Sequence, residues 1–527
     1  MDKNKEVIES EEFEKDIKTK KIALTIVIVF FVCSICLTGF LVNKRIDRAK
    51  PDNIVNDSIT YNSAYKMNDN SLSQFDLYFL KMENSRENKV YSPLSIKYAL
   101  GMLYQATDGE SKGQIDAVLG NYRGNKYQVS NHLMLANALF VRESKSNNVL
   151  AGYNTTIKDK YEAEVIDDPF IDASNINNWV STITYNHIND FISDDEYRSH
   201  DYELVNALAI DMEWVNKIQA DSRKKAYKVS YPHEDYNQSI LSLDTSSMQN
   251  IKFDSSKDVS ALTIGASANR YNIAKEYSDD EIKRIVTDEF KKYRANNGDV
   301  CLTEQQLNNF DEYLNNYVNE LKGNYGRLNS STDFLFADNE DEKIFAKDLK
   351  EYNGITLQYV SIMPKNSDLL EYIDKLDAKT LNRKVNNLSD LSIDSFSDGV
   401  ITQIDGYIPV FNYDYKLNLK QDLKNMGIVD IFDKEKADLS GMLKNIEGSY
   451  IESITHKSTI DFSNDGIKAA AVTAAHGAGS ASCEFDYFFE APVKKIDLTF
   501  DKPYMYLIRN KNTGEVWFIG TVYNPTK

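Results

Sequence analysis

The sequence predicts an α+β domain that follows an apolar segment near the N-terminus. Helical and strand-like hydrophobic patterns mix along the chain without a regular repeat, which argues against a solenoid and against a doubly wound sheet. The 527 residues are 42% hydrophobic and 11% aromatic, enough for a sizeable core. The formal net charge of −19 disfavours nucleic acid as a partner, because phosphate binding requires a basic surface.

The apolar segment, residues 22–42, contains no charged side chain. At 1.5 Å per residue it spans the roughly 30 Å hydrocarbon core as a helix. A cleaved signal peptide is the alternative, but the segment ends without a small-x-small cleavage site. Lysines flank both sides, so the positive-inside rule does not decide the orientation.

We expect a single-pass protein of the cell membrane, with its folded domain extracellular, because a bulky C-terminal domain after a single anchor most often ends up outside. Its expected parts are a cytoplasmic tail (1–21), a transmembrane anchor (22–42), a stalk (43–60) and a folded domain (61–527). The abundance of Asn, Lys and Ile suggests an AT-rich bacterial gene.

Helical spacing is clearest in two parts of the domain. An amphipathic helix is expected from about Ser71, with apolar residues Phe75, Leu77, Tyr78 and Leu80. In 270–323, two capping boxes precede apolar residues at helical spacing, and they predict an inserted hairpin of two helices. The boxes are Ser278 with Glu281 and Thr303 with Gln306. The simplest interpretation is an insertion that packs on the folded domain and has no function of its own, and a partner-binding surface is the alternative.

Sequence motifs for catalysis, metals and cofactors are missing. None of the six histidines lies in His-Glu-x-x-His or near paired cysteines, so no metal site is predicted. No Gly-x-Ser-x-Gly, phosphate-binding or dinucleotide motif occurs either. We expect a protein that is not an enzyme and has no cofactor; a membrane enzyme of unknown chemistry has no residues to support it.

Small residues dominate the segment 464–482. Alone, residues 468–475 would be predicted as a short helix, because alanine has the highest helix propensity. As a strand with Lys468 facing solvent, the segment would place on its other face Ile467, Ala469, Ala471, Thr473 and Ala475. These side chains are small or apolar enough to enter between two existing strands.

Several motifs elsewhere in the chain favour the strand over the helix for this segment, because of the order in which they occur. They are Tyr91-Ser-Pro-Leu-Ser-Ile96, Ala99-Leu-Gly-Met-Leu103, Asn137-Ala-Leu-Phe-Val141, Tyr161-x-Ala-Glu-Val165, Ile176-Asn-x-Trp-Val180, Leu204-Val-Asn-Ala207, Ile408-Pro-Val-Phe411, Met426-Gly-Ile428 and Ala437-Asp-Leu-Ser-Gly441. With the C-terminal strands after Phe500, this set resembles the serpin family. The resemblance implies the serpin fold, with three β-sheets, surrounding helices and an exposed reactive loop, here 464–495.

The resemblance also implies a function. A target serine protease, or as an alternative a cysteine protease, would cleave the loop and become covalently attached to it. The freed segment would then insert into the central sheet and distort the protease, and we expect the inhibitor to be a monomer. The implied hinge is Gly466, Ile467, Lys468, Ala469, Ala470, Ala471, Val472 and Thr473.

Further residues match family positions. Ser92, Ser95, Asn206 and His456 match a polar cluster beneath the part of the sheet that opens, called the shutter. Trp214 and Asn464 match the breach, the place where insertion starts. The family usually has acidic residues at both positions before the hinge glycine, whereas here Asn464 precedes Asp465. We expect the salt bridge of the first position to be missing or replaced by a neutral hydrogen bond.

The scissile bond is predicted at Ser480–Ala481 from the family spacing after Gly466. Counting back from Phe500 points to Pro492–Val493 instead, where proline disfavours cleavage. Small residues around Ser480 predict an elastase- or subtilisin-like target. Aromatic residues farther on, Phe485, Tyr487 and Phe488, leave a chymotrypsin-like target open, and Cys483 has no assigned role. The alternative function is a non-inhibitory serpin-fold module for binding or adhesion at the cell surface.

Overall fold

The computed structural model describes residues 63–67, 69–83, 85–218, 226–230, 237–241, 249–267, 273–297, 302–323, 333–390, 401–467, 487, 489 and 493–526. The expected tail, anchor and stalk (1–60) lie outside these residues, as do the predicted scissile bond Ser480–Ala481 and Cys483. Among the described residues, no helix is both long enough and apolar enough to cross a membrane.

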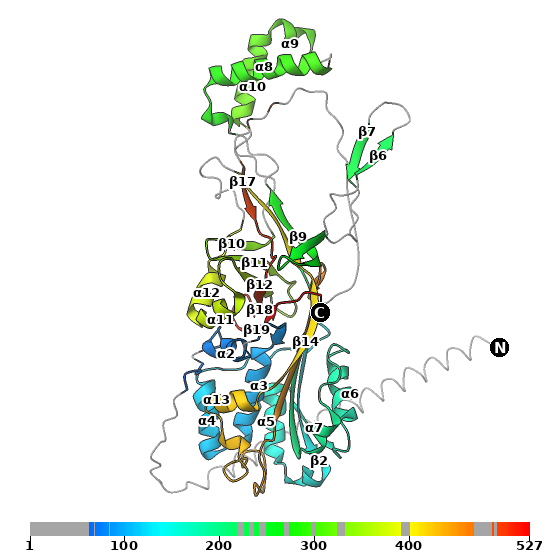
Figure 1. Ribbon diagram of the computed structural model, residues 1–527, viewed down its shortest axis with the longest axis vertical. Helices are drawn as coiled ribbons and strands as arrows, with labels where there is room; N and C mark the ends of the chain where they lie inside the picture. The colour runs from blue at the N-terminus through cyan, green and yellow to red at the C-terminus, as the bar shows by residue number, and fades with distance from the viewer. Residues whose placement is uncertain are drawn as a thin grey trace, which may run out of the picture. The chain divides into compact units, whose positions relative to one another are not determined.

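A seven-stranded mixed sheet, which includes the long strand β14 labelled in Figure 1, contains Gly466 and Ile467 of the small-residue segment. Its strands are β3 (Glu164–Asp168), β2 (Leu133–Arg142), β4 (Tyr202–Ile210), β15 (Ile454–Phe462), β14 (Phe411–Asn418), β16 (Gly466–Ile467) and β5 (Met212–Glu213). β4 is buried along its whole length, as expected for a central strand with both faces covered. It pairs antiparallel with β2 and parallel with β15.

The other strands among the described residues form three further sheets. A six-stranded antiparallel sheet contains β1 (Lys89–Tyr91), β19 (Val516–Val522), β18 (Tyr504–Asn510), β12 (Leu357–Pro364), β11 (Glu342–Asp348) and β10 (Leu335–Asp338). A four-stranded sheet contains β17 (Val493–Asp497), β13 (Ile401–Pro409), β9 (Lys257–Ser267) and β8 (Gln249–Phe253). The hairpin of β6 (Ala226–Ser230) and β7 (Asn237–Leu241) was not anticipated from the sequence.

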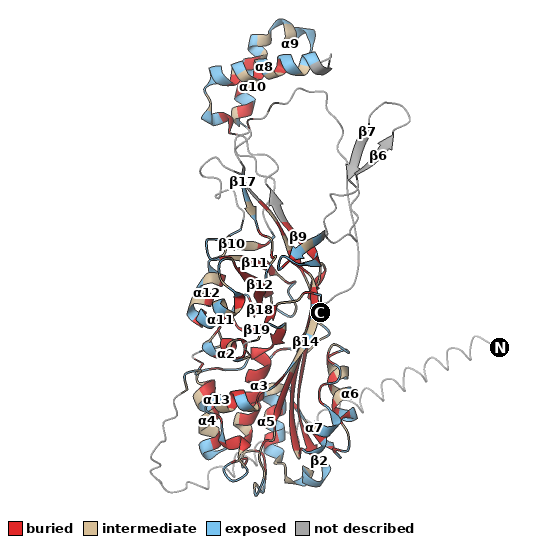
Figure 2. Ribbon diagram, viewed as in Figure 1, coloured by how far each residue is buried: buried red, intermediate tan, exposed pale blue. Residues whose placement is uncertain are grey.

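Helices of the domain body surround these sheets. They are α2 (Gln74–Met82), α3 (Pro93–Ala106), α4 (Gly109–Leu119), α5 (Ala151–Tyr161), α6 (Ser174–Ile183), α7 (Asp194–Arg198), α11 (Leu369–Lys375), α12 (Ala378–Asn386) and α13 (Lys420–Asn425), with short 3-10 turns η2 (Glu143–Asn148) and η5 (Asp430–Phe432). A further 3-10 turn, η3 (Ala274–Glu276), lies at the start of the insertion. The surface helices bury one face and expose the other, whereas α3 is buried over nearly all its length (Figure 2).

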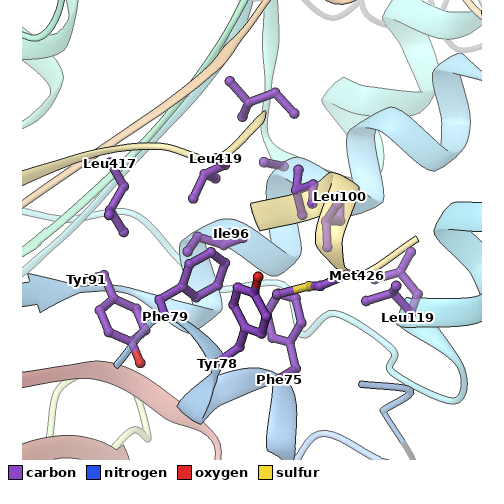
Figure 3. Packing of buried hydrophobic residues seen from close by; sticks show 14 of the residues in the cluster. Phe75, Tyr78, Phe79, Tyr91, Ile96, Leu100, Leu119, Leu417, Leu419 and Met426 are labelled. Carbon is purple, nitrogen blue, oxygen red and sulfur yellow. The ribbon is translucent and has the colours of Figure 1, made fainter. Parts of the chain in front are cut away.

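The helix predicted from about Ser71 forms as α2, which begins after Ser73. All four of its predicted apolar residues are buried. Figure 3 shows rings of α2 beside Tyr91 and the α3 residues Ile96 and Leu100. Phe79 meets Phe75 and Tyr91 edge-on, at ring-centroid distances of 5.9 and 5.4 Å, an arrangement favoured by aromatic quadrupoles. This core holds α3, and thereby its N-terminus, beneath the seven-stranded sheet.

The insertion contains three helices, α8 (Asp279–Asn297), α9 (Glu304–Asn308) and α10 (Phe310–Gly323). Both predicted capping boxes form: the Ser278 N–H donates to Glu281 at 3.0 Å, and the Gln306 N–H donates to Thr303 at 3.2 Å. The insertion was expected to contain two helices. That expectation is wrong, because the second helix is interrupted at Asn309 and forms α9 and α10. Asn309 has φ −116° and ψ 48°, and asparagine favours such non-helical backbone by competing for local hydrogen bonds.

Candidate functional site

The first two residues of the small-residue segment form a short strand inside the seven-stranded sheet. This strand, β16, lies between β5 and β15 and runs antiparallel to both. Gly466 is opposite Glu213, and Ile467 is opposite both Met212 and Phe462. Ile467 is 1% exposed, so its side chain is already in the core. Predicted hinge residues Lys468 to Thr473 lie outside the described residues.

Glycine is required at position 466 because the neighbouring strand is so close. A Cβ atom there would lie 2.2 Å from the Met212 carbonyl oxygen and 2.6 Å from the Glu213 Cα. Real Cβ atoms do not approach backbone this closely, so any other residue would push β16 away from β5. Gly466 thus permits the segment to begin its course between two strands.

Beyond β16 the sheet is closed. β4 and β15 pair directly and in parallel, from Leu204 opposite Ile454 to Leu208 opposite Ser458. A strand that continued in the direction of β16 would have to separate these two strands. It would replace one parallel ladder with two antiparallel ladders, which have the more favourable hydrogen-bond geometry.

Trp214 lies where the segment enters the sheet. It is 0% exposed, and its indole N–H donates to the Ser463 carbonyl oxygen at 2.9 Å. Its backbone N–H donates to the Asp465 carbonyl at 3.0 Å, and the Ile218 N–H donates to the Asn464 carbonyl at 3.0 Å. The two predicted breach residues, Trp214 and Asn464, therefore meet in the same backbone network.

An ion pair is present next to Asn464. The Lys217 ammonium lies 2.6 Å from the Asp465 carboxylate, which is 8% exposed. The expected loss of a salt bridge at Asn464 stays a prediction, because this ion pair belongs to Asp465, one residue later in the chain. Glu213, opposite Gly466, also pairs with Lys350. Lys217 was not identified from the sequence, and the only sequence signal for this ion pair was Asp465, the acidic residue beside Gly466.

The four predicted shutter residues lie in one buried network under the closed part of the sheet. The Ser92 backbone N–H donates to His456 Nε2 at 3.0 Å, and the Ser92 side chain accepts from the Ser95 N–H at 3.0 Å. The Ser95 hydroxyl donates to the Asn206 side-chain oxygen. Asn206 and His456 are register partners on β4 and β15. The N-terminus of α3 is thus hydrogen-bonded to both strands that would have to separate.

Two residues extend this network beyond those predicted. The Asn206 amide donates to Asn137 on β2 at 2.5 Å, and the Asn137 amide donates to the Tyr161 carbonyl at 2.9 Å. Ser458, two residues after His456, places its hydroxyl 2.9 Å from His456 Nε2. Asn137 belongs to one of the recognised motifs, but its contact with Asn206 depends on strand pairing across the sheet.

His456 is held neutral. It is 1% exposed, and burial lowers its pKa to about 3, against a smaller opposing effect of the Asn206 backbone. Its Nε2 can therefore accept the Ser92 N–H bond across the physiological pH range.

Within the described residues, no group of three or more His, Cys, Asp or Glu is placed to hold a metal ion. The polar cluster is thus a neutral hydrogen-bonded support for the sheet.

Comparisons with known proteins agree with this architecture. The family model described as "Serpin (serine protease inhibitor)" matches residues 70–264 and 328–525, leaving 265–327 unmatched. An "Uncharacterized serpin-like protein" of Methanosarcina acetivorans is 23% identical over 86% of this chain and 85% of its own. A "Leukocyte elastase inhibitor" of Xenopus laevis is 23% identical over 86% of this chain and 97% of its own.

Among solved structures, the native state of the thermophilic serpin tengpin superposes with a TM-score of 0.55 at 20% identity. That alignment covers 90% of this chain and 96% of tengpin. Native protease nexin-1, solved with heparin, gives a TM-score of 0.53 at 19% identity, over 85% of this chain and 96% of that one. At these identities the structures establish the fold.

Proposed function

The chain belongs to the serpin family, and from that premise we propose that it inhibits serine proteases as a suicide substrate. The target's catalytic serine attacks a carbonyl carbon of the exposed loop and forms an ester to the N-terminal part. The peptide C–N bond breaks, and the released amine, which takes up the proton, stays with the C-terminal part. Insertion of the freed segment as a strand then displaces the attached protease before water hydrolyses the ester.

The observation that carries this proposal is the position of β16. Gly466 and Ile467 already lie between β5 and β15, in the direction an inserted strand would take. The adjoining strands β4 and β15 are still paired with each other over 204–208 and 454–458. Insertion of a strand there would satisfy backbone groups on both of its edges and bury its small inward side chains. A closed sheet is what the proposal expects of the chain before insertion.

We propose an elastase- or subtilisin-like protease as the target. Around the predicted bond, Ser480–Ala481, the side chains are small and fit a small specificity pocket. The Xenopus laevis relative carries the name "Leukocyte elastase inhibitor", which supports an elastase-like target. A cysteine protease, whose thiolate would form a thioester in the same way, is the alternative.

Incubation with pancreatic elastase or subtilisin tests this proposal. We expect a complex that survives SDS and boiling, with the mass of the protease plus the chain up to the cleaved bond. Mass spectrometry of the released C-terminal fragment identifies the bond. Protease whose catalytic serine has been blocked beforehand is the control and should give no complex. Complete cleavage of the loop with undiminished protease activity would contradict inhibition.

We also propose that residues 22–42 anchor the protein as a monomer in the cell membrane, with the serpin domain outside. This anchor is supported by the absence of charged side chains in residues 22–42 and by their length, which is sufficient to span the hydrocarbon core. Extraction with carbonate should leave the full-length chain in the membrane fraction, whereas a variant lacking 1–42 should be released. Release of full-length chain by carbonate would argue against the anchor.

A non-inhibitory binding module is the second candidate, favoured by the unmatched segment 265–327 and by its contacts with the loop. The two functions differ in what cleavage does to stability. An inhibitor gains a strand and becomes markedly more stable, whereas a binding module keeps the same melting temperature. Calorimetry before and after limited proteolysis distinguishes them.

A further inference from the structure

The helical insertion contacts Tyr487 and Phe489, two described residues of the segment 464–495 that is predicted to be the reactive loop. On α10, the Tyr317 hydroxyl accepts the Tyr487 backbone N–H at 2.6 Å and donates to the Tyr487 carbonyl at 3.3 Å. At the start of the insertion, the Ile273 N–H donates to the Phe489 carbonyl at 2.9 Å. Backbone groups of two alternate loop residues are therefore bound by side-chain and backbone groups of the insertion.

Packing of aromatic rings reinforces these hydrogen bonds. Phe489 is 5% exposed, and its ring lies 4.9 Å from that of Tyr277 and 5.1 Å from that of Tyr487. Burying a phenylalanine stabilises a contact by more than a single hydrogen bond does. We call Ile273, Tyr277 and Tyr317 the clamp, since together they bind Tyr487 and Phe489.

Strand register explains why the insertion meets the loop. On β13, Gln403 is paired with Ser267, the last residue of β9, on one side and with Lys495 of β17 on the other. The insertion follows β9 and the loop leads into β17, so both join the four-stranded sheet at the same end. Strands on either side of β13 are about 10 Å apart, a distance that a few residues can span.

We propose that the clamp determines where the loop can be cut. A protease binds its substrate as an extended strand and needs the backbone groups on both sides of the scissile bond. Those of Tyr487 are occupied by Tyr317, and the Phe489 side chain is buried. The clamp therefore withholds Tyr487 and Phe489 from a chymotrypsin-like protease, which favours productive cleavage at the small residues before them. This specificity role rests on the proposed inhibitory function, but protection of the two residues can be measured without it.

The test compares chymotryptic cleavage of the folded chain and of its Tyr317→Phe variant. Cleavage through local opening follows the population of the open state, and loss of the hydroxyl should raise that population about five- to tenfold. We expect cleavage after Tyr487, quantified by mass spectrometry, to accelerate by this factor in Tyr317→Phe. Phe489→Ala, which removes the buried ring, should accelerate it further. Glu320→Gln, an exposed change on the same helix, should leave the rate unchanged.

Equal rates of cleavage after Tyr487 in the wild type, Tyr317→Phe and Phe489→Ala would overturn the proposal. Circular dichroism of each variant checks that the helices remain folded. The same variants are also incubated with elastase, so that failure of the two proposals can be told apart. Absence of any SDS-stable complex removes the inhibitory function, while the chymotryptic rates still decide whether the clamp protects Tyr487.

Discussion

Lys217 and Asp465 form an ion pair at 2.6 Å although 248 residues separate them in the chain. Asp465 immediately precedes the hinge glycine, and Lys217 follows β5, the strand beside which the hinge enters. The pair therefore joins the hinge to the neighbouring strand at the point where insertion would begin. Trp214 joins the same two segments through its own hydrogen bonds to Ser463 and Asp465.

Replacing Asp465 with asparagine should lower the free energy of unfolding by about 1–2 kcal/mol, because a hydrogen bond between charged groups becomes a weaker one. Urea denaturation measures the change, and a double-mutant cycle with Lys217→Gln isolates the pair. Asp258→Asn is the control, because its ion pair with Lys252 is well exposed and should contribute little. A coupling energy near zero would show that Lys217 and Asp465 do not support one another.

Gly466→Ala should destabilise the protein by about 1–3 kcal/mol through overpacking. The added methyl would collide with the Met212 carbonyl and the Glu213 Cα, neither of which can rotate away. Gly152→Ala is the matched control: no atom lies within 4 Å of its added Cβ, and alanine is the better helix former. Thermal unfolding of both variants gives the comparison. If Gly466→Ala is as stable as the wild type, β16 is not confined as described.

A charge on the inward face of the hinge should convert an inhibitor into a substrate. Ile467 is buried, so alternation places Thr473 on the inward face of an inserted strand and Val472 on the outward face. We expect Thr473→Arg to abolish the SDS-stable complex while the loop is still cleaved, because an unpaired buried charge is costly. Val472→Arg should retain the complex. Equal complex formation by the two variants would argue against strand insertion.

His456 should make stability depend on pH. Unfolded histidine binds a proton below about pH 6.5, but buried His456, with its pKa near 3, does not. Its contribution is therefore complete above pH 6.5 and is lost as the pH falls towards 3, by about 1.4 kcal/mol per pH unit. The stability advantage of the wild type over His456→Gln should shrink accordingly between pH 6 and pH 4 in urea titrations.

Asp422 provides a control of opposite sign for this measurement. Burial raises its pKa to about 6, so its protonated form is favoured in the folded state. Its contribution is present below the unfolded value of 3.8 and is lost as the pH rises through 6. Asp422→Asn should therefore gain stability relative to the wild type over that range. If His456→Gln and the wild type have parallel pH profiles, the histidine is not held neutral.

Local features could be predicted because their causes lie within a few residues. The starts of α2, α8 and α9 follow from serine or threonine caps whose partners are three positions away. The order of short motifs was enough to identify the family. By contrast, the break at Asn309 and the hairpin of β6 and β7 were missed, since short elements leave little periodicity.

By itself, the sequence determined the α+β class, the family, and the residues of the buried polar cluster. Only the tertiary structure decided that β4 and β15 are paired, that Asp465 and not Asn464 carries the ion pair, and that the insertion binds Tyr487. The physical reason is distance along the chain. Each of these contacts joins segments well over a hundred residues apart, and strand pairing and register bring them together.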